Sequence, residues 1–199
     1  PQLGERRVTV ERPGATAFYE ICHRVPPAIH EDWAKLEILD NIFTGSSGAS
    51  DNKTSRLYKA LVKTEIAASV GGGINPTIDP YLYSIIVTLR DGRTTEDAEK
   101  IVLEEIQRLQ TDGISEDELI KAKKQAKAAF AYSTESMTEQ AYWLARSLIL
   151  GDEYWFDNYV ERLSAVTVDE VLDVAKRYLV PQNRVVGVLV PTESEVEAV

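Results

Sequence analysis

Two histidines and one cysteine are the best metal ligands in this sequence, so we first examined whether they fit a hydrolytic metal site. A zinc peptidase holds its metal with two histidines on one helix beside a glutamate, spaced as H-E-x-x-H or inverted as H-x-x-E-H. His23 and His30 are the only histidines, and the residues four positions after them are Pro27 and Ala34. Neighbouring strand residues point to opposite faces, so Cys22 and His23 are not expected to converge. The sequence predicts no metal site and no catalytic residue here, but a buried thiol and two surface or hydrogen-bonded imidazoles.

The glycine-rich segments also miss the motifs of nucleophilic and nucleotide chemistry. Gly45–Ala49 has the form G-S-S-G-A, which lacks the last glycine of the G-x-S-x-G nucleophile turn. Lys53-Thr54 lacks both glycines that a phosphate-binding loop places before this pair. Gly71-Gly72-Gly73 leads toward a strand and not a helix, so it predicts a bulge or a close approach between backbones.

Composition excludes several classes of protein. The net charge of −10 argues against nucleic acid, which requires a clustered basic face. An acidic surface serves ordinary solubility, or it steers basic peptides toward the chain. One cysteine permits no internal disulfide, and no apolar run reaches the roughly 18 residues that span a membrane. The compartment stays open, with the cytoplasm favoured. Because the chain starts with Pro1-Gln2, we expect a piece of a longer protein.

The periodicity of apolar residues predicts strands and helices in a definite order. Residues 81–90 alternate with a period of two, which places Tyr81, Tyr83, Ile85, Val87 and Leu89 on one buried face. A capping box of Ser115 with Glu118 opens a long helix, in which the poor helix formers at 133–136 favour a kink. We expect strands at 6–10, 16–25, 66–74, 81–90 and 185–190, and helices at 31–43, 55–63, 94–109, 115–150, 152–163 and 167–179.

This order predicts an α+β fold with an antiparallel or mixed sheet and helices packed on one face. The strands come in adjacent pairs and do not alternate singly with helices. Nothing inside the chain resembles a linker, so we expect one domain over residues 1–199, with a loose acidic tail at 192–199. One aromatic group is interpreted as core, with a partner-facing patch as the alternative; it comprises Tyr142, Trp143, Tyr154, Trp155, Phe156 and Tyr159.

Several segments resemble one family of enzymes when they are taken in order. Ser55–Leu61 is similar to the Ser-Arg-Leu-(Tyr/Phe)-x-x-Leu segment of pitrilysin-type and mitochondrial-processing-type zinc peptidases, and Ile66–Val70 is similar to the strand that follows it there. Gly113–Lys123 resembles their Gly-Ile-(Thr/Ser)-x-x-Glu-Leu segment, and Ala165–Leu179 resembles their Ala-Val-Thr ending with its Tyr-Leu. Together these matches extend over residues 30–190.

The resemblance implies a non-catalytic, zinc-free domain from a zinc metalloendopeptidase. Members of this family build a clamshell from repeated α+β domains, of which one carries the inverted zinc motif and a related one lacks it. This chain is similar to the latter, so the resemblance implies zinc only in a partner domain, peptide as the substrate, and no cofactor of its own. The alternative is a structural or assembly subunit of the same family without peptidase activity.

Two features of the resemblance concern substrate contacts. Many relatives hold the substrate with an arginine and a tyrosine whose matching positions here are Val62 and Ala68. The non-catalytic subunit of the mitochondrial enzyme has a glycine-rich substrate loop where this chain has Gly45–Asn52. The resemblance therefore implies substrate-binding roles for Gly45, Ser46, Ser47 and Gly48, with a plain surface connection as the alternative.

Overall fold

The structure is a computed structural model that describes residues 2–45 and 53–192. Its strands are β1 (Arg6–Pro13), β2 (Phe18–Val25), β3 (Ala67–Ile74), β4 (Tyr81–Leu89) and β5 (Arg184–Thr192). Its helices are α1 (Trp33–Phe43), α2 (Thr95–Asp112), α3 (Glu116–Tyr132), α4 (Met137–Leu150), α5 (Tyr159–Ala165) and α6 (Val168–Tyr178), with a short π-helix η1 (Tyr58–Val62) and a 3₁₀ turn η2 (Pro181–Asn183). Ser46–Gly48 and the tail from residue 193 lie outside the described residues.

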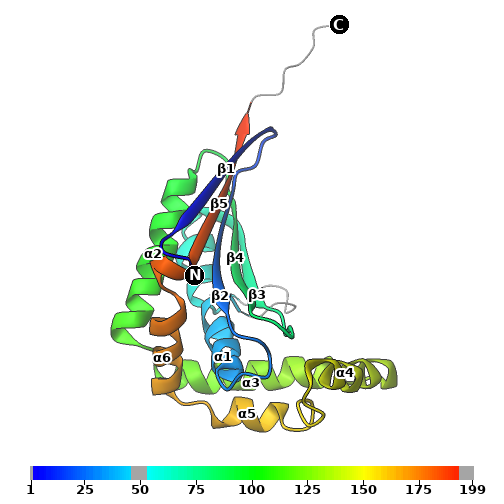
Figure 1. The fold of residues 1–199 in the computed structure, drawn as a ribbon. Coiled ribbons are helices and arrows are strands. Elements are labelled where there is room, and N and C mark those ends of the chain that lie inside the picture. The colour runs from blue at the N-terminus through cyan, green and yellow to red at the C-terminus, as the bar shows by residue number, and fades with distance from the viewer. Residues whose placement is uncertain (1, 46–52, 193–199) are drawn as a thin grey trace, which may run out of the picture.

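The strands form one mixed sheet in the order β1-β5-β2-β4-β3 (Figure 1). β1 runs parallel to β5, while the β2–β5, β2–β4 and β3–β4 pairs are antiparallel. The first two strands are therefore not partners of each other, because β5 returns from the far end of the chain and lies between them. The expected α+β class with an antiparallel or mixed sheet is confirmed in its mixed form.

One face of the sheet carries the helices and the core (Figure 1). Along β2 the alternate side chains from Tyr19 to Val25 are buried, and along β4 those from Tyr83 to Leu89 are buried, as a period of two requires. On the opposite face Phe18 and Ile86 remain partly exposed. The predicted one-sided sheet is confirmed, except that Tyr81 is half exposed, because it begins β4 at the edge of the helical layer and borders an open groove beside α4.

Side-chain caps set the helix starts in the second half of the chain. Thr94, Ser115, Ser136 and Thr167 each accept a hydrogen bond from the backbone N–H three residues later, and the side chain at that position bonds back. The single helix expected over 115–150 is in fact two, because α3 ends at Tyr132 and the Ser136 cap starts α4. The poor helix formers between them cause a full break, where a kink was expected.

Two further expected helices are shorter in the structure. Within 55–63 the chain forms the π-helix η1, and within 152–163 it makes turns until α5 begins at Tyr159. Among the described residues no helix has the length and apolar character needed to cross a membrane.

Candidate functional site

The two histidines and the cysteine lie apart in environments that do not suit metal binding. His23 is fully buried in β2, and neither ring nitrogen has a hydrogen-bond partner. Burial lowers the pKa of His23 to about 4, so its ring is neutral at pH 7. The expectation of a surface or hydrogen-bonded imidazole is wrong for His23, because the alternation of β2 turns it toward the core. His30 is exposed, and its Nδ1 accepts a hydrogen bond from the backbone of Asp32.

Cys22 faces away from His23, as strand alternation predicts, and its surroundings disfavour the thiolate. Its thiol is only half-buried, 3.2 Å from the hydroxyl of Ser84, which corrects the expectation of a buried thiol. Burial raises the pKa of Cys22 to about 11, and the thiolate is the form that ligates metals. Over residues 2–45 and 53–192, no group of three or more His, Cys, Asp or Glu side chains is arranged to hold a metal ion.

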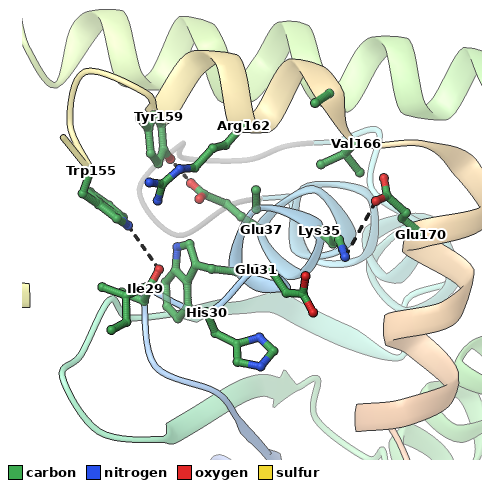
Figure 2. A pocket seen from close by; sticks show the side chains of 14 residues that line it. Ile29, His30, Glu31, Lys35, Glu37, Trp155, Tyr159, Arg162, Val166 and Glu170 are labelled. Atoms are coloured by element: carbon green, nitrogen blue, oxygen red, sulfur yellow. Dashed lines mark hydrogen bonds and ion pairs between the residues drawn. The ribbon is translucent and has the colours of Figure 1, made fainter. Parts of the chain in front are cut away.

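Two cavities meet at the N-terminal half of α1 and share one wall. One has a volume of about 460 Å³ and opens between α1, α5 and the start of α6, as Figure 2 shows. The other has a volume of about 570 Å³ and lies between α1, the end of β3 and the α3–α4 break. The shared wall consists of Trp33, Glu37, Trp155 and Tyr159.

Glu37 is the unusual member of that wall. The Tyr159 hydroxyl donates a hydrogen bond to its Oε1, whereas its Oε2 is buried and has no hydrogen-bond partner. Burial raises the pKa of Glu37 to about 7. The neighbouring Asp40 carboxyl adds to the rise, whereas the side chains of Tyr159 and Trp33 oppose it. One turn further along α1, burial raises the pKa of Asp40 to about 6, although Thr44 donates a hydrogen bond to it.

The sequence analysis did not single out these two carboxyl groups. Apolar residues lie on almost every side of α1, from Trp33 to Phe43, and a helix of that kind is buried all round. Any acidic residue within it must then enter the core. The composition of this segment therefore carries the signal, whereas the spacing of its apolar residues alone predicts only the helix.

The aromatic residues expected in the core divide between two environments. Trp155 is 2% exposed and stacks on Trp143 with ring centroids 5.6 Å apart, and its indole N–H donates to the carbonyl of Ala28. Phe130 from α3 stacks on Tyr159 at 4.5 Å. The core interpretation is confirmed for Trp155 and Tyr159, whereas Tyr142 and Tyr154 are about 60% exposed.

Comparison with known proteins identifies the family. Residues 1–126 match the family model described as the peptidase M16 inactive domain. The chain belongs to the M16 inactive-domain family. The resemblance to pitrilysin-type metallopeptidases, and to their non-catalytic domain in particular, is thereby confirmed. No curated protein matches the chain in sequence.

Solved structures share the fold of this M16 domain. A protease from Helicobacter pylori superimposes with a TM-score of 0.87 at 22% identity, over 96% of this chain and 45% of its own. The inactive peptidase domain of a protein assigned as a zinc protease, from Bordetella parapertussis, gives 0.82 at 25% identity, over 95% of this chain and 98% of its own. Complex III2 from Candida albicans gives 0.79 at 20% identity, over 94% and 46%. The chain therefore spans less than half the length of the first and third of these.

Two of the segments that resemble the family are joined in the structure of the M16 domain. The Arg56 guanidinium donates to both carboxylate oxygens of Glu118, at 2.8 and 2.9 Å, and to the carbonyl of Gly113 at 2.8 Å. Hydrogen bonds from Arg56 outweigh burial and lower the pKa of Glu118 to about 2. Glu118 also caps α3 through Ser115. These motif residues therefore hold η1 against the start of α3.

A buried carboxylate ties the start of α1 to α6 in a similar way. Asp32 is fully buried and accepts hydrogen bonds from Arg177 at 2.7 Å, Tyr178 at 2.9 Å and Lys35 at 3.1 Å. Burial alone would raise the pKa of Asp32, but these donors outweigh it and lower the pKa to about 2. This link positions α1, which carries Glu37.

The residues tied to substrate contacts are only partly described. Val62 ends η1 and packs on the core, and Ala68 is exposed on β3 beside a bulge. Gly45 follows α1 with a positive φ of 106°, and its N–H donates to the carbonyl of Asp40. Ser46, Ser47 and Gly48 lie outside the described residues, so their substrate-binding role stays a prediction.

Proposed function

We propose that this M16 inactive domain forms one half of the substrate chamber of a zinc metalloendopeptidase, opposite a domain that carries the zinc. In this arrangement the partner domain would hold the zinc, which would activate water for hydrolysis of the peptide, and a glutamate of that domain would act as the base. This chain contributes chamber wall and peptide contacts, and no metal ligand. We also propose that residues 1–199 make up a single domain.

The match of residues 1–126 to the M16 inactive domain carries the proposal. The fold neighbours from Helicobacter pylori and Candida albicans are each about twice as long as this chain, which supports a second half of similar size.

A peptide can contact this domain at two places that we propose as its substrate surface. Among the described residues β3 pairs with β4 alone and so lies at an edge of the sheet, and its Gly71–Gly73 segment carries no side chains. An extended peptide adds to such an edge through main-chain hydrogen bonds. Gly45 follows α1, and we propose that Gly45, Ser46, Ser47 and Gly48 provide further contacts.

A structural role is the second candidate, and one observation favours it. Val62 and Ala68 supply no polar side chain where many relatives place an arginine and a tyrosine. The fold neighbour in Complex III2 from Candida albicans belongs to an assembly, and this supports a subunit without peptidase activity.

Reconstitution separates the two candidates. The chain alone is expected to bind no stoichiometric zinc and to cleave no peptide. Purified together with the zinc-carrying half that its own gene or a neighbouring gene encodes, it should restore cleavage of unfolded peptides. Zinc content and cleavage are measured on the same samples. A complex that forms and binds zinc but cleaves nothing would favour the structural role, and stoichiometric zinc in the isolated chain would refute the assignment.

The loop proposal is tested in the reconstituted enzyme. The double change Ser46→Ala with Ser47→Ala removes two hydroxyl groups and should raise KM by up to about thirtyfold while kcat changes little, because hydrogen bonds of this kind contribute about 1 kcal/mol each. Thr111→Ala, an exposed change on α2, is the matched control. An unchanged KM in the double variant would remove the loop from the substrate surface.

A further inference from the structure

Glu37 presents an unpaired acceptor at the wall between two cavities. Buried polar atoms nearly always have a partner, so an orphan carboxylate oxygen calls for an explanation. Oε1 already accepts the Tyr159 hydroxyl, and Oε2 remains without a donor. Figure 2 shows the Glu37 carboxylate and the Tyr159 hydroxyl directed toward each other and joined by a dashed line, with Trp155 to the side.

The positive side chains around the cavities are engaged elsewhere. Lys35 lies 3.1 Å from Asp32, and Arg162 lies 2.6 Å from Asp152. Arg146 donates to the carbonyl of Pro76 and lies over the ring of Tyr142. The described titratable and charged groups that line the two cavities are His30, Glu31, Lys35, Glu37, Asp40, Tyr132, Arg146, Tyr159, Arg162 and Glu170.

We propose that this site binds an organic cation, an ammonium or guanidinium group, whose N–H donors pair with Glu37 Oε2. The aromatic faces of Trp33, Trp155 and Tyr159 supply the rest of the site, since indole and phenol rings attract cations. Where the cation is a lysine or arginine side chain of a bound peptide, the inference rests on the proposed function.

Other ligand classes fit the site less well. A metal ion needs several ligands, and the described residues provide no group of three or more His, Cys, Asp or Glu side chains for one. An anion would meet Glu37 and Asp40 at the wall and would find Lys35 and Arg162 already paired. A donor-rich cation complements the unpaired acceptor, and the net charge of −10 favours its approach.

Binding should depend on pH through Glu37. The cation pairs with the ionised carboxylate, and burial raises the pKa of Glu37 to about 7. The ionised fraction therefore increases about tenfold from pH 6 to pH 8, and the affinity for the cation increases with it. Asp40, whose pKa is raised to about 6, changes the affinity in the same direction.

The test uses Nα-acetyl-arginine amide and its neutral isostere Nα-acetyl-citrulline amide on the 199-residue chain, with affinity measured by NMR titration. The arginine compound should bind, about tenfold more tightly at pH 8 than at pH 6, and the citrulline compound should not. Glu37→Gln should weaken binding at least tenfold and remove most of its pH dependence. Glu31→Gln, which changes another carboxyl lining the cavity, is the matched control and should bind like the wild type.

The NMR spectrum of Glu37→Gln guards against loss of folding as the cause. Its amide shifts outside the two cavity walls should match those of the wild type. Absence of arginine binding, equal binding of citrulline, or binding unaffected by Glu37→Gln would each overturn the proposal without touching the reconstitution result. An arginine-containing peptide that binds no more tightly than the amide would assign the site to free cations; tighter binding would assign it to peptides.

Discussion

Glu37 makes the stability of the domain depend on pH in an unusual direction. A carboxyl group whose folded pKa lies above its unfolded value binds its proton more tightly in the folded state. Its ordinary value is 4.5, and burial raises it to about 7. The folded state is therefore favoured at low pH, and this contribution is lost as the pH rises from 4.5 through 7. Asp40 acts in the same direction, since burial raises its pKa to about 6.

Glu37→Gln should remove most of this dependence. Glutamine has nearly the same shape and needs no charge in the core, so the variant should be more stable than the wild type at pH 8, on the order of 2 kcal/mol. At pH 5 the two should be similar. Urea unfolding at both pH values measures the effect, with Glu31→Gln as the exposed control. Parallel pH profiles for the wild type and Glu37→Gln would contradict the buried position of the carboxyl.

At the level of elements, the glycines of β3 have unequal roles. A Cβ on Gly72 would lie 2.6 Å from the carbonyl oxygen of Ser84 and 2.7 Å from Cγ2 of Thr44, at the end of α1. A Cβ on Gly71 would meet nothing within 4 Å. The expectation of a close backbone approach in this segment is confirmed at Gly72. The bulge in β3 lies elsewhere, between Ala67 and Ser69.

This difference gives a matched pair of variants. Gly72→Ala forces β3 away from β4 and α1, and should cost about 1–3 kcal/mol, the usual range for an overpacked core. Gly71→Ala should change stability by much less. Thermal unfolding of both variants measures the difference. Equal losses in the two would mean that strand propensity, and not contact with Thr44 and Ser84, decides the effect.

Local sequence signals predicted which segments form strands and helices better than they predicted which strands pair with each other. Alternation in β4 and the capping box at Ser115 predicted those elements because both signals depend on neighbouring residues. The pairing of β1 with β5 joins residues about 180 positions apart, and no local pattern specifies it. The cavity at Glu37 has the same origin, since its wall draws Trp155 and Tyr159 from far along the chain.

Across the whole molecule, protection of backbone amides from hydrogen exchange should decline from the centre of the sheet outward. β2 and β4 each have strands on both sides and bury every second side chain. β1 is an edge strand whose residues are all exposed. In Figure 1, α4 extends away from the sheet, and most of its side chains are exposed, Met137 and Leu148 among them.

Hydrogen exchange of the isolated chain should follow this arrangement. Amides of β2 and β4 are expected to exchange only through global unfolding, whereas those of β1 and α4 should exchange through local opening, faster by orders of magnitude. The two ends of α4 should differ in exchange rate. Ser147 and Leu150, near its C-terminus, are buried, whereas no residue in its first turn is buried. Protection of all of α4 equal to that of β2 would contradict this order. It would mean that another surface covers the exposed apolar side chains of α4 in solution.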